Sequence, residues 1–261
     1  MNCAICNRKS EIIFSKRILN QYAADYHECI GCGFVFVPFH EQWLDEAYSS
    51  AITRTDIGLL SRNYNYAATT QKLLLDHFNT ESPFLDYAGG YGVFTRLMRD
   101  RGFDFYHEDA YCENLFAHDF DVKRNQKETY ELVTAFEFME HIPDPVKELE
   151  SIFRRTESFL FSTEIIPDNG LQNWWYLATE TGQHISFYTV ESLQVLAEKF
   201  NRRLHSNGKN LHLITSKELP EDILTSQRKS LFSFLKRGKK RKSRLFADYK
   251  LVKGKISHDE K

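Results

Sequence analysis

The feature that most constrains the fold of this 261-residue chain is a glycine-rich turn between a buried strand and a helix. Residues 84–88 form an apolar run typical of a short buried strand, and the turn that follows is Ala88-Gly89-Gly90-Tyr91-Gly92. The spacing of Phe94, Leu97 and Met98 predicts an amphipathic helix over 95–101, ended by Gly102. A second strand is predicted over 103–107. This strand–turn–helix–strand order indicates an α/β fold with a parallel sheet.

Such a turn suits a ligand that approaches the backbone closely. In nucleotide-binding α/β folds, an acid about 20 residues further on binds the ribose hydroxyls. Here Asp109 follows Asp86 by 109 − 86 = 23 residues. The glycine spacing is not that of a dinucleotide fingerprint, and no Gly-Lys-Ser/Thr follows, which excludes a P-loop. Taken alone, the glycines are also compatible with a purely structural turn.

The segment resembles the D-x-G-x-G-x-G motif of the Rossmann-like S-adenosylmethionine-dependent methyltransferases, with alanine at the first glycine position. The likeness continues in a strand predicted over 130–136, in Glu137 just beyond it, and in the segment Phe138-Met-Glu-His-Ile-Pro-Asp-Pro145. Asp144 is expected to cap the next helix, with Pro145 at its first position. The resemblance implies these cofactor-binding residues: Asp86, Ala88, Gly89, Gly90, Gly92, Asp109, Phe136, Glu137 and His141. Asp86 is expected to support the loop, and Asp109 to bind the ribose.

The resemblance covers about residues 64–216 and implies a mostly parallel seven-stranded sheet with a terminal antiparallel hairpin. The pattern predicts a strand over 158–163, a helix over 190–200 and a strand over 211–215. Asn207-Gly208 is a typical hairpin turn ahead of that last strand.

Four of the five cysteines form two pairs, Cys3-x-x-Cys6 and Cys29-x-x-Cys32. Two such pairs make a tetrahedral thiolate site that suits zinc, and a site with four protein ligands is structural. The 22 residues between the pairs fit a hairpin, and residues 11–19 resemble a strand. The N-terminus has no apolar secretory signal, so we expect a cytoplasmic protein with reduced thiols. Unpaired or disulfide-bonded cysteines are the alternative.

A cysteine module ahead of a methyltransferase domain resembles the zinc-containing sugar C-methyltransferases. The predicted domains are a zinc-binding module over 1–45, a methyltransferase domain over 46–218 and a basic tail over 219–261. That family carries a Glu-His-x-x-Tyr-Phe-Ser segment whose histidine is the base, and the matching stretch here is Gly182-Gln-His-Ile-Ser-Phe-Tyr-Thr189. His184 matches the histidine, while Gln183 replaces the glutamate.

The resemblance makes His184 the candidate general base, because imidazole titrates near neutral pH. A core or positional histidine is the alternative. Glu137 is expected to face the methionine part of the cofactor or the acceptor, and is the second candidate catalytic residue. Two aromatic groups are candidates for pocket walls: Trp174, Trp175 and Tyr176 for the acceptor, and Tyr64 and Tyr66 for the cofactor. Core packing accounts for the first group equally well.

The formal charge of −2 conceals an uneven distribution. Seven basic residues lie within 236–244, which leaves 34 − 7 = 27 basic against 36 acidic residues elsewhere. The sequence predicts a small-molecule acceptor, such as a nucleotide-linked sugar or polysaccharide precursor. RNA is the second hypothesis, because a basic tail can grip phosphates. A non-enzymatic cofactor-binding module is the third.

Overall fold

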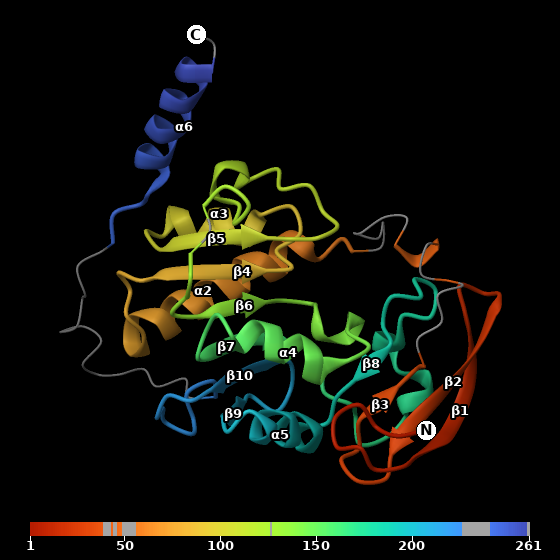
Figure 1. The fold of residues 1–261 in the computed structure, drawn as a ribbon. Coiled ribbons are helices and arrows are strands. Elements are labelled where there is room, and N and C mark those ends of the chain that lie inside the picture. Colours follow the sequence, from red (N-terminus) through yellow and green to blue (C-terminus); the bar gives the residue numbers. More distant parts are fainter. Residues whose placement is uncertain (39–42, 44–45, 49–55, 126, 226–240, 260–261) are drawn as a thin grey trace. The chain divides into compact units, whose positions relative to one another are not determined.

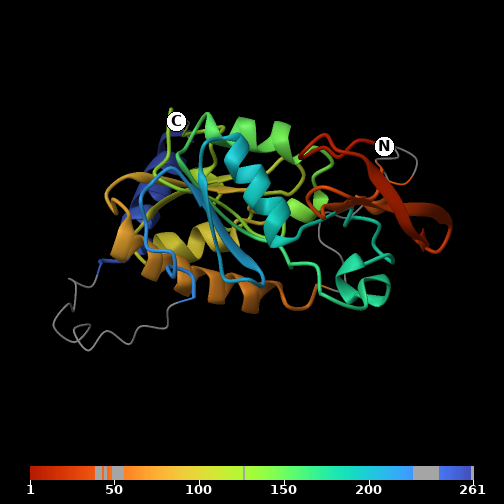
Figure 2. The ribbon, with the colours of Figure 1, turned by 90° about the horizontal axis from the view of Figure 1, so that it is seen from below.

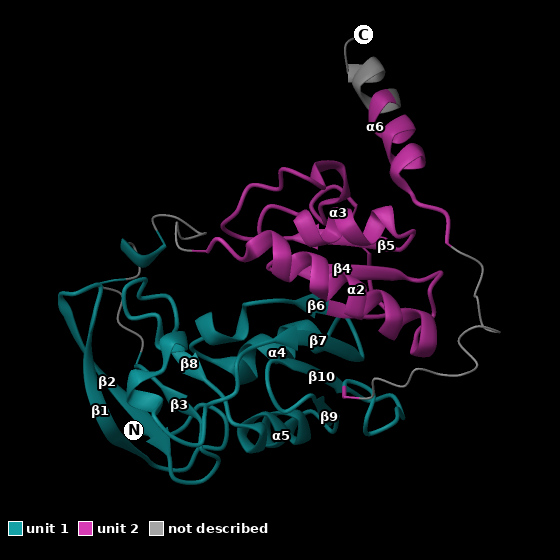
Figure 3. Cartoon of the chain, turned by 180° about the vertical axis from the view of Figure 1, so that it is seen from behind, with its two compact units in different colours: residues 1–55, 134–224 teal, residues 56–133, 225–261 magenta. Residues whose placement is uncertain are grey.

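The computed structural model describes residues 1–38, 43, 46–48, 56–125, 127–225 and 241–259. The chain forms two compact units, which Figure 3 shows in different colours. Unit 1 comprises residues 1–55 and 134–224, and unit 2 comprises residues 56–133 and 225–261. Neither unit is continuous in sequence. The chain passes from unit 1 to unit 2 at residue 56, returns to unit 1 within the strand at residues 133–135, and enters unit 2 again at residue 225.

Unit 2 contains the strand–turn–helix–strand order predicted from the sequence. Its elements are α2 (Leu59–His77), β4 (Pro83–Tyr87), α3 (Val93–Asp100), β5 (Asp104–Glu108) and a short 3₁₀ helix, η1 (His118–Phe120). Strands β4 and β5 are parallel and in register from Pro83 opposite Asp104 to Tyr87 opposite Glu108. Phe84 and Phe105 stack with ring centroids 5.1 Å apart, so aromatic rings fill the core between the elements.

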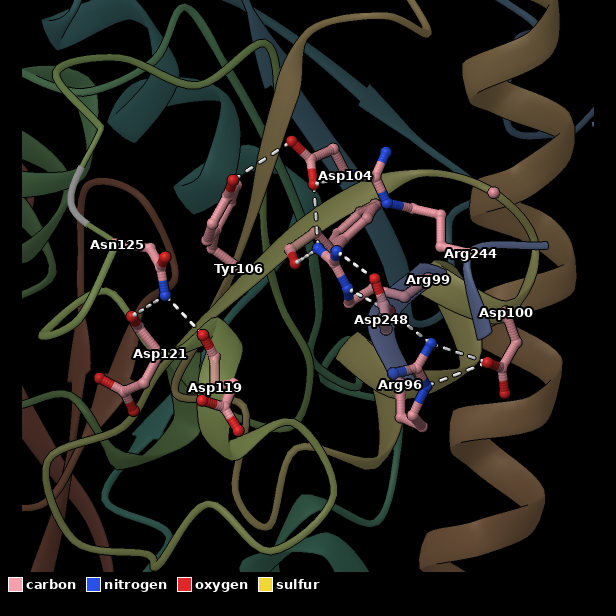
Figure 4. Close-up of polar contacts among 12 residues, drawn as sticks. Arg96, Arg99, Asp100, Asp104, Tyr106, Asp119, Asp121, Asn125, Arg244 and Asp248 are labelled. Atoms are coloured by element: carbon pink, nitrogen blue, oxygen red, sulfur yellow. Dashed lines mark hydrogen bonds and ion pairs between the residues drawn. The ribbon is translucent and has the colours of Figure 1, made fainter. Parts of the chain in front are cut away.

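The C-terminal helix α6 (Leu245–Asp259) also belongs to unit 2. Figure 4 shows the ion-pair network at its start. The buried Arg99 of α3 donates through Nε and Nη2 to the two carboxylate oxygens of Asp248, both at 2.9 Å, and through Nη1 to Asp104 at 3.0 Å. Arg244 pairs with Asp104 at 3.0 Å. The described part of the predicted tail therefore makes specific contacts, while its residues 226–240 lie outside the described part of the chain.

Unit 1 contains a four-stranded sheet in the order β1-β2-β3-β8, with all its pairings antiparallel. Its strands are β1 (Ser10–Ile18), β2 (Tyr22–Cys29), β3 (Val35–Phe36) and β8 (Ser186–Phe187). The predicted hairpin between the cysteine pairs is β1–β2, the long ribbon coloured red in Figure 2. Strand β8 lies just after His184 in sequence, so this sheet joins the N-terminal residues to the predicted base.

The rest of unit 1 carries the antiparallel end of the larger sheet. Strand β10 (Leu211–Thr215) pairs antiparallel with both β7 (Ser158–Ser162) and β9 (Arg203–Ser206). The unit also contains helices α4 (Pro145–Phe153) and α5 (Val190–Lys199), and the ring of Phe153 lies 5.1 Å from that of Phe200 just after α5. Asp144 caps α4 by accepting a hydrogen bond from the Lys147 amide, with proline at the first turn, as predicted. Three short 3₁₀ helices complete the unit: η2 (Met139–His141), η3 (Leu171–Asn173) and η4 (Trp175–Leu177).

The larger sheet is mixed, and its described strands number six, not the seven expected. Their hydrogen-bonded order is β5-β4-β6-β7-β10-β9, where β6 (Val133–Ala135) contains the boundary between the units (Figure 1). A further strand beside β5 is reduced to one parallel bridge between His107 and Asp121. Residues 118–125 instead form η1 and turns held by the Asp121 carbonyl, so their backbone groups do not extend into a ladder.

Long-range contacts attach the N-terminal segment to residues 179–187 within unit 1. Leu19 donates its amide hydrogen to the carbonyl of Thr179, and Val37 does the same to Ile185, both at 2.8 Å. The Trp43 indole donates to the Gly182 carbonyl at 3.1 Å. The boundary predicted at residues 45/46 stays a prediction, and one hydrophobic cluster of described residues joins the N-terminal segment to Tyr176, Ile185 and Phe187.

Among the described residues, no helix has both the length and the apolar character needed to cross a bilayer.

Candidate functional site

The glycine-rich turn after β4 is held by side chains from both sides. Asp86 is buried at 2% exposure and accepts a hydrogen bond from the Thr95 hydroxyl at 2.9 Å, which ties the strand to the first turn of α3. A Cβ on Gly89 would lie 2.5 Å from the Asp86 carboxylate and 2.8 Å from the His107 ring. Only glycine is therefore compatible with this approach. Ala88 has a φ of 51°, so it takes up a left-handed conformation that glycine would adopt without strain.

Asp109 lies against the same turn. Its Oδ2 accepts the amide hydrogen of Gly90 at 2.9 Å, and its Oδ1 accepts those of Tyr111 and Cys112 at 2.8 and 2.7 Å. A carboxylate has about four lone-pair positions, so one remains for a ligand hydroxyl. The carboxylate predicted to bind ribose thus sits beside the glycine turn and already orders its backbone.

His107 is a residue of this turn that the sequence reasoning missed. Its Nε2 lies 2.9 Å from the carbonyl of Gly90, which can only accept, so Nε2 carries the proton. Its Nδ1 lies 3.4 Å from Asp121. The ring is fully buried and connects the turn to the chain after β5. The sequence places His107 in the predicted strand over 103–107, but a strand pattern does not indicate which groups a histidine contacts.

The N-terminus of α3 has no capping side chain. Gly92, at φ 81°, is its N-cap, and its first turn holds no acidic residue. A Cβ on Gly92 would meet Asn114 at 2.5 Å, so glycine also lets the segment around Asn114 approach. The helix dipole favours negative charge at this end. The turn, Asp109 and this helix end together fit a ligand with a ribose and a carboxylate.

The four cysteines of the predicted knuckle converge, with one Sγ from each within 4.8 Å of the others. The Sγ atoms of Cys3 and Cys32 are 3.8 Å apart, and those of Cys6 and Cys29 are 3.3 Å apart. Tetrahedral zinc at about 2.3 Å from each sulfur requires separations of roughly 3.8 Å, so the cluster fits the ion. The pKa of the Cys3 thiol is lowered to about 5, chiefly by a hydrogen bond from Cys32.

The candidate base, His184, has one defined ring orientation. Its Nδ1 lies 2.7 Å from the carbonyl of Tyr176, which can only accept, so Nδ1 donates and Nε2 keeps its lone pair. The ring stands perpendicular to that of His141, with centroids 5.1 Å apart. His141 in turn makes a 3.1 Å hydrogen bond through Nδ1 to the Tyr48 hydroxyl. His141 and His184 are half-buried residues.

Burial keeps both imidazoles neutral. It lowers the pKa of His184, against the opposing effects of the Tyr176 carbonyl and Glu137. Burial and the neighbouring His184 lower the pKa of His141 to about 3. The two rings therefore offer lone pairs rather than positive charge at neutral pH.

Glu140 lies behind these rings with 0% exposure. Neither of its carboxylate oxygens has a partner at hydrogen-bonding geometry among the described residues, and the same holds for the hydroxyls of Tyr176 and Thr163. Burial and the nearby Glu137 raise the pKa of Glu140 to about 8, even though those two hydroxyls favour its charged form. Sequence reasoning treated Glu140 only as the neighbour of His141, since burial of a glutamate leaves no trace in the sequence.

Glu137 occupies a strained position just after β6. Its φ is 54°, unusual for a residue other than glycine. Its amide donates to the Ser162 hydroxyl and its Oε1 accepts from it, both at 2.7 Å. Such strain concentrates at functional sites. Phe136, one residue earlier, is half-buried.

The aromatic candidates separate by burial. Tyr176 is buried at 1% and packs against Trp174 in the unit 1 core, while Trp175 is 73% exposed. Of the predicted acceptor wall, only Trp175 presents most of its ring to solvent. Tyr64 of α2 is 61% exposed, with the Arg101 guanidinium 5.4 Å from its ring centroid.

Comparison with protein-family models identifies the family of the central domain. The family model described as a methyltransferase domain matches residues 59–207, more than half of the chain. The chain belongs to this methyltransferase family. Its match begins with α2 and ends after β9, so it includes the glycine turn, Asp109, Glu137, Glu140 and His184.

Solved structures give weaker likenesses. A putative O-methyltransferase from Nostoc punctiforme has 12% identity and a TM-score of 0.45, with 66% of each chain covered. An O-methyltransferase family 2 protein from Planctomyces limnophilus, complexed with apigenin, has 14% identity and a TM-score of 0.42, covering 65% of this chain and 63% of that one. The calicheamicin-biosynthesis methyltransferase CalO1, bound to S-adenosylhomocysteine, has 14% identity and a TM-score of 0.41, covering 66% and 60%. This chain thus spans less than two thirds of the first matched structures, and no curated protein matches it significantly.

Proposed function

We propose that this chain transfers the methyl group of S-adenosylmethionine to a small-molecule acceptor, such as a nucleotide-linked sugar or polysaccharide precursor. The observation that carries the proposal is the glycine turn braced by Asp109 at the N-terminus of α3, which no side chain caps, within a matched methyltransferase domain. The turn and Asp109 would hold the ribose, and the helix end the carboxylate. When bound, the cofactor supplies an electrophilic methyl group on a sulfonium.

His184 is the residue that we propose takes the acceptor's proton. Its Nδ1 is committed to the Tyr176 carbonyl, which leaves the Nε2 lone pair free and the ring fixed. Its lowered pKa keeps that lone pair available at neutral pH. As the acceptor atom forms its bond to the methyl group, its proton passes to Nε2. Glu137 is proposed to line the pocket of the cofactor or acceptor.

The cofactor is tested by calorimetric titration of the zinc-loaded protein with S-adenosylmethionine and S-adenosylhomocysteine. We expect micromolar-class binding, about −8 kcal/mol, weakened at least tenfold by Asp109→Asn. The control is Asp76→Asn on the exposed face of α2, which should bind as the wild type does. Absence of binding by the wild type would remove the proposal and favour a non-enzymatic module.

The base is tested with His184→Asn, whose amide can still donate to the Tyr176 carbonyl but which lacks Nε2. The affinity for the cofactor should stay unchanged. The rate of S-adenosylhomocysteine formation, measured with hydroxyl-bearing acceptors that the wild type methylates, should fall by about 10²–10⁴-fold. Unchanged turnover would exclude His184 as the base.

The cysteine cluster is proposed to hold a structural zinc ion. Cys3 and Cys29 each accept a backbone amide on Sγ, from Ile5 and Gly31 at 3.3 Å, which is compatible with thiolate ligands. Metal analysis should find one zinc per chain whose retention depends on the four cysteines, and Cys6→Ser should reduce its affinity. Loss of the ion should also increase amide hydrogen exchange in residues 179–187, because the N-terminal segment forms hydrogen bonds with them.

RNA remains the lesser alternative. Two of the seven clustered basic residues, Arg241 and Arg244, are engaged within unit 2 by Glu81, the Gly102 carbonyl and Asp104. They are therefore less available for phosphates than their sequence suggests.

A further inference from the structure

A second group of metal-ligand residues lies in unit 1, apart from the cysteine cluster. Glu140, His141 and His184 each offer one ligand atom, and these three atoms lie within 4.8 Å of one another. The first two come from η2, and the third from the segment just before β8. The main-chain bond from the Ile185 amide to the Glu140 carbonyl, at 2.9 Å, fixes the two segments together.

The polar atoms at this point suit a cation. Glu140 is fully buried, neither of its carboxylate oxygens has a partner at hydrogen-bonding geometry among the described residues, and buried carboxylates are normally paired or bound to metal. Two neutral imidazoles face the same point. Carboxylate and imidazole ligands together match the two-histidine, one-carboxylate sets that bind divalent transition metals.

The outer contacts also match those of a metal centre. A ligating histidine normally donates its other ring nitrogen hydrogen to a carbonyl or carboxylate, which fixes ring and tautomer. His184 does this through Nδ1 to the Tyr176 carbonyl, which leaves its Nε2 as a ligand atom. The Nδ1 atom of His141 lies 3.1 Å from the Tyr48 hydroxyl. Glu140 is buried, whereas His141 and His184 are half-buried residues.

We propose that Glu140, His141 and His184 bind one divalent transition-metal ion, with at least one coordination position left for water or an acceptor oxygen. The ion neutralises the Glu140 carboxylate and joins η2 to the segment before β8. Binding requires neither cofactor nor acceptor, so this site does not rest on the proposed methyl transfer.

The ion changes the task of His184 in the proposed reaction. With a metal bound, the Nε2 lone pair is a ligand and cannot take a proton. An acceptor hydroxyl would instead lose its proton to solvent on coordination, because a divalent ion lowers the pKa of a bound oxygen. The direct proton transfer to His184 described above would therefore operate only in protein without a metal ion at this site.

The test is equilibrium dialysis of the zinc-loaded full chain against Co²⁺, with metal counted per chain by mass spectrometry. The wild type is expected to retain one zinc and one cobalt, without the absorption band of cobalt–thiolate bonds. Glu140→Gln and His184→Asn should weaken cobalt binding at least about 100-fold, since loss of an outer partner alone costs roughly 10–100-fold. The exposed His118→Gln of unit 2 is the control and should keep both ions.

Glu140→Gln is the decisive variant because it removes the ligand carboxylate without changing the shape of the side chain, so the protein should fold. Its thermal unfolding, measured beside the wild type, verifies this and gives a second readout. Added cobalt should raise the melting temperature of the wild type and leave that of Glu140→Gln unchanged. A wild type that retains only one metal ion per chain in total, or a folded Glu140→Gln that binds cobalt as tightly as the wild type, would overturn the proposal.

Discussion

At the scale of single residues, Ala88 is held in a conformation that its side chain disfavours. Its φ of 51° costs a residue other than glycine about 1–2 kcal/mol. We expect Ala88→Gly to stabilise the zinc-loaded protein by about 0.5–1 kcal/mol, because relief of strain exceeds the added entropy of the unfolded chain. The exposed Ala68 of α2 is the matched control, and its change to glycine should cost about 1 kcal/mol. Urea denaturation compares them, and losses of equal size would contradict a strained Ala88.

His212 of β10 predicts how stability responds to acid. The ring is fully buried, with Nδ1 2.9 Å from the Ser206 hydroxyl and Nε2 3.0 Å from the Thr163 carbonyl, and burial lowers its pKa to about 4. Between about pH 6.5 and 4 the unfolded chain binds the extra proton, so stability is retained above this window and lost as pH falls through it. The contribution is about 3 kcal/mol.

His212→Gln should flatten this part of the stability profile, because glutamine does not titrate. Denaturation midpoints at pH 7, 6, 5 and 4 measure the difference between the two proteins. If both profiles keep the same slope below pH 6.5, another group is responsible for the acid sensitivity.

At the scale of elements, the start of α5 is stabilised by one hydroxyl. Thr189 accepts the Ser192 amide hydrogen at 3.0 Å, the Ser192 hydroxyl completes the capping box, and the Thr189 hydroxyl donates to the Cys32 carbonyl at 3.0 Å. Thr189→Ala should therefore cost about 1–2 kcal/mol in thermal or chemical unfolding. Thr189→Ser keeps the hydroxyl and should recover most of this loss. Failure of serine to recover it would assign the effect to the methyl group instead.

The elements with a strong local signal were predictable from the sequence. The strand at 211–215 has the predicted bounds, those around the glycine turn differ by one or two residues, and the four cysteines converge as their spacing indicated. Local patterns failed where distant segments decide the structure. Strand β8 has two residues and exists only because β3 pairs with it. The expected seventh strand is absent from the described sheet, and beside β5 the chain makes one bridge, since Asp121 uses its backbone in turns.

The same limit applies to the candidate site. His184 and Glu137 were found through their sequence context, but the partners that orient them are remote: the Tyr176 carbonyl and the Ser162 hydroxyl. Glu140 carried no signal, because only the folded chain removes its carboxylate from water. Chemistry-bearing residues are thus readable from sequence, while tautomer, strain and burial require the structure.

At the scale of the whole chain, the C-terminal residues have a structural task that their charge pattern concealed. Asp248 accepts two hydrogen bonds from Arg99 across 149 residues of sequence and a third from Arg96, all at 2.9 Å. The Arg99 side chain is only 2% exposed, so it depends on this counter-ion (Figure 4). Breaking a buried ion pair leaves an uncompensated charge, and we expect Asp248→Ala to destabilise the protein by about 3 kcal/mol.

The control is Glu150→Ala, which breaks the pair with Arg154 on the surface of α4. Its partners are 74% and 58% exposed, so the change should lie within about 0.5 kcal/mol of the wild type. Chemical denaturation of both variants, with a chain ending at residue 240 as the third sample, measures the contribution of the C-terminal segment. The truncated chain should lose at least as much stability as Asp248→Ala, because it also removes Arg241 and Arg244. If the truncation is neutral, Arg99 is satisfied by Asp104 and the Phe105 carbonyl alone, and the C-terminal segment is free for another partner.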